Sequence, residues 1–154
     1  MNGPDRSIRQ TLLDLKGKPA WGLHRTYGSV FFGEVGKQRP LADERQIHGE
    51  WHFLVEVCQW RFDSQDAIFL GSDDQQPFID DNFLHLELGL INVADVCHPS
   101  NDLRIAFSSG VVFRTFSTAA ASADPWTQWH LYCPDDGVWT LDAIGRLTCR
   151  NAYT

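Results

Sequence analysis

The stretch GEWHFLVEVCQWRF, residues 49–62, decides how the fold is organised, because Trp51–Phe62 has the residue types of one long β-strand. Side chains alternate between the two faces of a strand. One face would carry Trp51, Phe53, Val55, Val57, Gln59 and Arg61, and the other would carry His52, Leu54, Glu56, Cys58, Trp60 and Phe62. The first face is apolar until its last two positions, whereas the second mixes polar and apolar residues. We therefore predict a central strand that is covered by a helix on one face and partly exposed on the other.

The covering helix is predicted in the segment GSDDQQPFIDDNFLHLELG, residues 71–89. Ser72 or Asp73 can cap its start, Pro77 suits the first turn, and Gly89 can end it. The apolar stripe expected to pack on the sheet consists of Ile79, Phe83, Leu86 and Leu90. The pattern thus predicts one principal helix over about residues 74–88.

The rest of the chain predicts a short N-terminal helix within Asp5–Leu15, a polar loop over residues 37–49 and a small-residue loop over residues 119–125. Strand-like runs and short turns alternate between residues 91 and 151, and strands joined by such turns are antiparallel. We predict an α+β fold in which a mainly antiparallel, curled β-sheet of about seven to nine strands packs on the principal helix. Residues 1–154 are expected to form a single domain.

The composition indicates a globular protein of 154 residues with 43% hydrophobic and 21% charged residues. The first ten residues are polar, and no stretch approaches the roughly 20 apolar residues of a membrane span. Four dispersed cysteines form no CxxC motif, so no disulfide framework is predicted. We expect a cytoplasmic protein that does not associate with membranes and whose thiols are reduced.

Negative charge is concentrated in the middle of the chain. Thirteen acids and two bases lie between Asp43 and Asp102, whereas the net charge of the whole chain is −7. Six acids occur between residues 63 and 81 without any Lys or Arg, namely Asp63, Asp66, Asp73, Asp74, Asp80 and Asp81. Such a field repels phosphate backbones and attracts basic proteins. We predict these six residues as a partner-binding surface and expect no nucleic acid ligand, although a solvated acidic face would look the same in sequence.

No catalytic, cofactor or metal signature is complete. The metal-like pairs are His48 with His52, His130 with Cys133, and Cys97 with His98, and none belongs to a recognised four-ligand zinc pattern. On one strand, His52 and Cys58 would be six residues apart at about 3.3 Å per residue, too far for a nucleophile and its base. Glycine-rich phosphate-binding motifs are also absent. We therefore predict no catalytic residue, no metal and no cofactor.

Two short motifs carry a resemblance to a known group of proteins. The first is G-E-W-H followed by C-x-W-R, formed by Gly49, Glu50, Trp51, His52, Cys58, Trp60 and Arg61. The second is a late W-x-L-x-x-P-D-G-like turn, formed by Trp129, Leu131, Pro134, Asp135 and Gly137, with Asp136 inserted before the glycine. With these motifs the chain resembles a group of small uncharacterised bacterial proteins, which implies no catalytic residue. Its size and β-rich build are similar to those of immunity proteins of bacterial toxin systems.

The leading hypothesis is a non-enzymatic immunity or inhibitor protein whose acidic surface binds a basic partner such as a toxin. An alternative is a small-molecule-binding protein or enzyme with a pocket in the curled sheet. That pocket would be lined by His52, Glu56, Trp60, Arg61, Trp129 and His130. A further alternative is a subunit that assembles with itself or with a larger complex.

Overall fold

A computed structural model of the protein describes residues 7–39, 47–117 and 126–151. Its elements follow the chain in the order α1 (Ile8–Leu13), β1 (Pro19–Arg25), β2 (Phe31–Gln38), β3 (Gly49–Val55), β4 (Gln59–Asp63), β5 (Ile68–Gly71), α2 (Gln76–His85), β6 (Gly89–Cys97), β7 (Asp102–Phe107), β8 (Val112–Phe116), β9 (Thr127–Tyr132), β10 (Gly137–Asp142) and β11 (Leu147–Asn151). The loop predicted over residues 119–125 and the central part of the loop predicted over residues 37–49 lie outside the described residues.

The strands form one mainly antiparallel sheet, as the short connections predict, in the order β11-β10-β9-β3-β2-β1-β6-β7-β8-β4-β5. The described residues contain eleven strands, so the expected seven to nine was wrong. The undercount has a simple cause: the 49–62 stretch contains two strands, and β5 is only four residues long. The sheet is open rather than curled into a closed structure, because β11 and β5 lie at opposite ends of the strand order.

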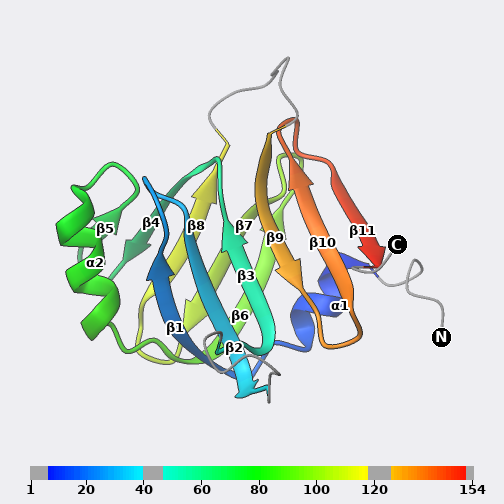
Figure 1. Ribbon diagram of the computed structural model, residues 1–154, viewed down its shortest axis with the longest axis horizontal. Coiled ribbons are helices and arrows are strands. Elements are labelled where there is room, and N and C mark those ends of the chain that lie inside the picture. The colour runs from blue at the N-terminus through cyan, green and yellow to red at the C-terminus, as the bar shows by residue number, and fades with distance from the viewer. Residues whose placement is uncertain (1–6, 40–46, 118–125, 152–154) are drawn as a thin grey trace.

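The sheet is arranged as two layers that face one another (Figure 1). The strands β11, β10, β9, β3, β2 and β1 form one layer, and β6, β7, β8, β4 and β5 form the other. The layers are joined where Pro19 and Ala20 of β1 pair with Leu90 and Gly89 of β6. Phe31 of β2 lies 5.7 Å, between ring centroids, from Phe113 of β8. In the strand order, β1, β6 and β7 stand between β2 and β8, so this contact crosses from one layer to the other. The second layer therefore covers the inner face of β3, where the sequence predicted a helix.

The predicted long strand 51–62 is broken at Glu56, Val57 and Cys58. Its first part, β3, pairs with β2 and β9, whereas its second part, β4, pairs with β8 and β5 in the opposite layer. The buried positions change parity across the break, from Trp51, Phe53 and Val55 to Trp60 and Phe62. A continuous strand cannot bury both sets on one face, so the chain crosses between the layers here.

Two short helices take the place of one principal helix on the sheet, and α2 is shorter than predicted. Its N-cap is Gln75, not Ser72 or Asp73, and it ends at His85, with Leu86 as an extended C-cap and Gly89 as the first residue of β6. It lies at one end of the two layers, beside β1 and β5 (Figure 1). There Phe83 packs 5.1 Å, between ring centroids, from Phe31. The helix thus covers the end of the aromatic core rather than a face of β3.

The N-terminal helix α1 lies at the other end of the molecule and contacts β6 (Figure 1). Ser7 and Gln10 form a reciprocal capping box that fixes its start. Leu12 and Leu15 are fully buried, as their spacing predicts. Neither helix in the described part of the chain is long and apolar enough to cross a bilayer.

Candidate functional site

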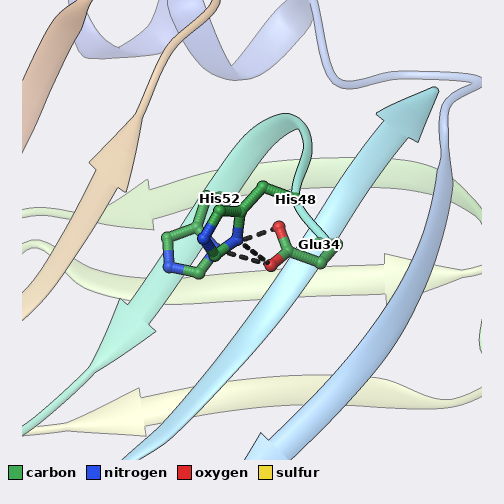
Figure 2. Close-up of side chains that lie close together, drawn as sticks. All are labelled: Glu34, His48 and His52. Carbon is green, nitrogen blue, oxygen red and sulfur yellow. Dashed lines mark hydrogen bonds and ion pairs between the residues drawn. The ribbon is translucent and has the colours of Figure 1, made fainter. Parts of the chain in front are cut away.

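A cluster of one carboxylate and two histidines lies on the outer face of β2 and β3 (Figure 2). The Nδ1 atom of His52 lies 2.7 Å from Oε1 of Glu34, and the Nδ1 atom of His48 lies 2.8 Å from the same oxygen. The backbone N–H of Gly49 donates to the other oxygen, Oε2, at 3.1 Å. Glu34 is only 3% exposed, His52 is mostly buried, and His48 is about one-third exposed, at 34%. The buried carboxylate is therefore held by three donors from one short segment.

A β-bulge brings this segment onto Glu34. Glu34 lies directly opposite His52 in the pairing of β2 with β3, and the register then shifts between Val35 and Gln38. Bulges increase the local twist and re-aim side chains. A Cβ atom at Gly49 would lie 2.6 Å from the carbonyl oxygen of Val35, so only glycine permits this close approach of the strands.

The cluster opens onto a pocket of about 290 Å³. Its wall contains Phe32, Arg39, His48, Gly49, Glu50, His52, Tyr132 and Cys133. Phe32 stacks on the His52 ring at 4.8 Å between centroids and fixes its orientation. One side of the cluster is thus packed against the sheet, and His48 remains accessible from the pocket.

A second histidine–carboxylate group lies beside it on the outer face of β9. The Nε2 atom of His130 lies 3.1 Å from Oε1 of Glu56, and Thr127 donates its hydroxyl to the other oxygen of Glu56. Thr140 lies 2.9 Å from Nδ1 of His130. Burial lowers the pKa of His130, and the nearby Glu56 carboxylate only partly opposes this effect. Tyr132, whose pKa is raised by burial and by Glu56, lies between His130 and His52.

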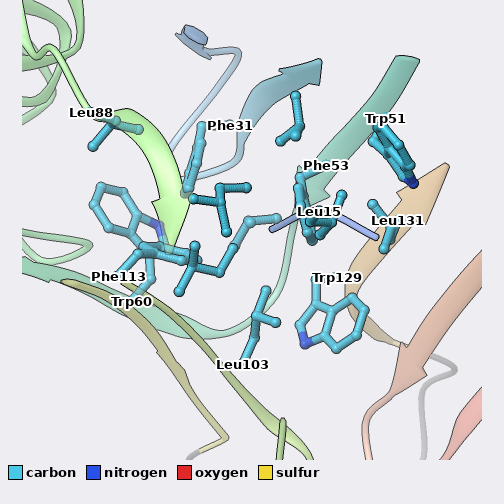
Figure 3. Packing of buried hydrophobic residues seen from close by; sticks show 14 of the residues in the cluster. Leu15, Phe31, Trp51, Phe53, Trp60, Leu88, Leu103, Phe113, Trp129 and Leu131 are labelled. Carbon is cyan, nitrogen blue, oxygen red and sulfur yellow. The ribbon is translucent and has the colours of Figure 1, made fainter. Parts of the chain in front are cut away.

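The six residues predicted to line one pocket lie in three different places. His52, Glu56 and His130 are on the outer face, as described above, but Trp60 and Trp129 are buried in the core (Figure 3). Arg61 lies in the opposite layer, where it pairs with Asp63 and covers the ring of Phe116. The sequence pattern placed His52, Glu56 and Trp60 on one face of one strand, whereas the break at residues 56–58 puts Trp60 and Arg61 on a strand of the opposite layer. Between the layers, the described residues leave an apolar cavity of only about 40 Å³.

A nucleophile–base pair of Cys58 with His52, which the sequence spacing already argues against, is also disfavoured by the chemistry of the thiol. Burial, with a smaller contribution from Asp102, raises the pKa of Cys58 to about 12. Its Sγ atom donates to the carbonyl oxygen of Gln128. Because the thiolate is the nucleophile, Cys58 is a packing residue at neutral pH.

Of the six predicted partner-binding acids, some have carboxylates that pair with arginines and others have exposed carboxylates. Arg25 binds both carboxylate oxygens of Asp80, at 2.7 and 2.8 Å, and thereby lowers the pKa of Asp80. Asp63 pairs with Arg61 and Arg114 and is mostly buried. The other four acids, Asp66, Asp73, Asp74 and Asp81, are exposed. Two of the six charges are therefore neutralised within the free protein.

The exposed acids near α2 alternate with exposed apolar side chains. Phe78 is 50% exposed and Leu84 is 78% exposed. A groove of about 420 Å³ runs between Ala20–Leu23 of β1 and Phe83–Gly89. We define the α2 surface as Asp73, Asp74, Phe78, Asp81, Leu84 and Glu87, together with this groove. Apolar patches rimmed by polar residues are typical of interaction sites.

Glu34 is a member of the cluster that the sequence pattern did not predict. The pair His48 and His52 was noticed, but its carboxylate partner lies 14 and 18 residues earlier in the chain. One signal for it exists: an acidic residue in the middle of the otherwise apolar strand segment VFFGEVG, residues 30–36. A charge at such a position needs a partner when it is buried.

No protein-family model matches the chain, and the comparisons with curated proteins and with solved structures found no match either. The molecule itself offers two candidate functional features, the Glu34–His48–His52 cluster and the α2 surface.

Proposed function

We propose that the protein is a non-catalytic binding protein of the immunity or inhibitor kind, which uses the α2 surface to occupy a basic partner protein. The observation that supports this proposal is the exposure of Phe78 and Leu84 among unneutralised carboxylates, beside a groove. Protein interfaces commonly combine an apolar centre with a polar rim. The resemblance to small bacterial proteins with an immunity-like build agrees with such a role.

The negative charge around α2 would act mainly on the association rate and on which partner is selected. Between Phe62 and Leu103 the chain has no Lys or Arg, so the field around α2 has one sign apart from the contribution of Arg25 and other distant bases. A one-signed surface steers an oppositely charged partner and increases the association rate, and salt screens this effect. The apolar side chains Phe78 and Leu84 would then be buried in the complex. Inhibition would follow from occlusion of the partner's basic site.

The test begins with crosslinking and copurification from native cells, followed by identification and purification of the recovered partner. Binding is then measured by titration at low and moderate salt for the wild type and for D73N/D81N. Both residues are exposed, so their loss should weaken association at least several-fold at low salt, and less at higher salt. L84A should accelerate dissociation.

The matched control is D135N/D136N, which removes the same charge at the turn between β9 and β10. It should bind like the wild type. Two outcomes contradict the proposal. Either no protein partner is recovered, or neither D73N/D81N nor L84A changes the binding of the recovered partner.

A further inference from the structure

We propose that Glu34, His48 and His52 form a binding site for one divalent first-row transition-metal ion, with Zn²⁺ as the best-suited ion. The three residues belong to β2, β3 and the residue before β3, and none of them is part of the α2 surface, so the site does not depend on the function proposed above. Its ligands would be Nδ1 of each histidine and Oε1 of Glu34. The remaining coordination position would face the pocket of about 290 Å³.

The donor set is the first argument. Two imidazole nitrogens and one carboxylate oxygen are the ligands of many zinc and non-haem iron sites that keep an open position. One ligand atom from each of Glu34, His48 and His52 lies within 4.8 Å of the others. Zinc–ligand bonds of about 2.0–2.2 Å in a tetrahedron put neighbouring ligand atoms roughly 3.3 Å apart. The present Nδ1–Oε1 distances of 2.7 and 2.8 Å need to open only slightly, which side-chain torsions allow.

The way the cluster is held is the second argument. The backbone N–H of Gly49 donates to Oε2 of Glu34. Oε1 lies 2.8 Å from Nδ1 of His48 and 2.7 Å from Nδ1 of His52, which is also 2.9 Å from Oε2. Phe32 fixes the ring plane of His52 by stacking. Such outer contacts orient ligands before the ion arrives and increase metal affinity. The ligand oxygen and one ligand ring are therefore preorganised by groups that would not bind the ion.

The hydrogen-bonded arrangement is the metal-free form of the same site. An ionised Glu34 can only accept, so each histidine must carry its proton on Nδ1 to donate to it. When the proton of a neutral imidazole sits on Nε2 instead, the Nδ1 lone pair points along the same direction toward the carboxylate. An ion can thus replace the hydrogen bonds between the histidines and the carboxylate without a change in fold. His48, being one-third exposed, provides the path by which the ion enters.

The test uses the full chain with C97S, because the exposed neighbours Cys97 and His98 offer a thiol and an imidazole that can also bind zinc. The protein is dialysed against a chelator and titrated with Co²⁺, whose visible spectrum reports coordination, and with Zn²⁺ by calorimetry. We expect one ion per chain. The melting temperature should rise with Zn²⁺ concentration, because the ion binds the folded state.

H48Q is the decisive variant, because its partly exposed side chain can be changed with little effect on folding. It should lower Zn²⁺ affinity at least tenfold and abolish the Zn²⁺-dependent rise in melting temperature. H52Q should do the same, with near-ultraviolet circular dichroism confirming that each variant is folded. The matched control is H85Q, which removes an exposed histidine that also lies near a carboxylate, Asp81. It should bind like the C97S parent.

Three outcomes overturn the proposal. The first is the absence of stoichiometric binding by the folded C97S protein. The second is binding that is equal in C97S, H48Q and H52Q. The third is binding that is present with Cys97 and lost in C97S, which would assign the metal to the Cys97–His98 pair.

Discussion

At the scale of single residues, the outer face of β3 and β9 shows how burial changes the chemistry of a histidine. His130 lies beside Glu56, whose charge favours the protonated imidazole, yet burial has the larger effect and lowers the pKa of His130. The unfolded chain therefore binds a proton more readily than the folded protein does. Protonation of His130 consequently favours unfolding.

This direction predicts how stability depends on pH. As the pH falls below the ordinary value of 6.5, the unfolded state gains a proton before the folded state does, so the free energy of unfolding decreases. One proton contributes a slope of at most about 1.4 kcal/mol per pH unit. H130Q should flatten the slope between pH 7 and pH 5 in urea denaturation. Between pH 7.5 and pH 9 the slopes of wild type and variant should agree, and an unchanged slope on the acid side contradicts the prediction.

At the scale of elements, the two helices begin in different ways. Ser7 accepts a hydrogen bond from the backbone N–H of Gln10 at the start of α1. Gln75 stands at the N-cap of α2 with extended backbone angles but makes no side-chain hydrogen bond to the helix. The start of α2 therefore leaves backbone donors without a side-chain acceptor. This explains why the sequence pattern, which relied on Ser72 or Asp73 as the cap, predicted the wrong boundary.

A better cap should stabilise the protein. We expect Q75S to increase the free energy of unfolding by about 0.5–1 kcal/mol, because a serine hydroxyl can accept from the first turn. Chemical denaturation of Q75S and of Q76S, which changes the first helical residue instead of the cap, makes the comparison. No gain for Q75S relative to Q76S would show that the N-cap of α2 does not limit stability.

At the scale of the whole molecule, aromatic side chains from both layers and from α2 hold the structure together. Phe31 of β2 lies 6.2 Å from Phe62 of β4 and 5.1 Å from Phe83 of α2, measured between ring centroids. Phe62 in turn lies 4.8 Å from Phe113 of β8. In the described part of the chain, strand pairing links the layers where β1 meets β6. Side-chain packing is therefore what keeps the two layers face to face.

Removal of the central ring should destabilise the whole molecule. F62A is expected to lower the free energy of unfolding by about 3–5 kcal/mol, because it leaves a cavity between the layers. F78A, which removes the same ring from a half-exposed position, should change it by about 0.5 kcal/mol or less. Urea denaturation compares the two, with F62L as the milder variant if F62A does not fold. Equal costs for F62A and F78A would contradict this account of the interface between the layers.

The sequence by itself determined the features that depend on near neighbours. Alternation, turn residues and helical spacing predicted the antiparallel strands from β6 to β11, the short helix α1 and the position of α2 to within a few residues. Those patterns repeat every two to four residues, so they can be seen without knowledge of the rest of the chain. The concentration of acids between residues 63 and 81 is equally a property of the sequence alone.

The tertiary structure alone decided which distant residues meet. It broke the 49–62 stretch between two layers, joined Asp80 to Arg25 across 55 positions, and placed Glu34 against His48 and His52. Strand pairing between distant segments depends on the free energy of the complete arrangement, including the burial of Phe62 and Trp60 in the opposite layer from Phe53. No local pattern carries that information, and for this reason the candidate metal site became visible only in the folded protein.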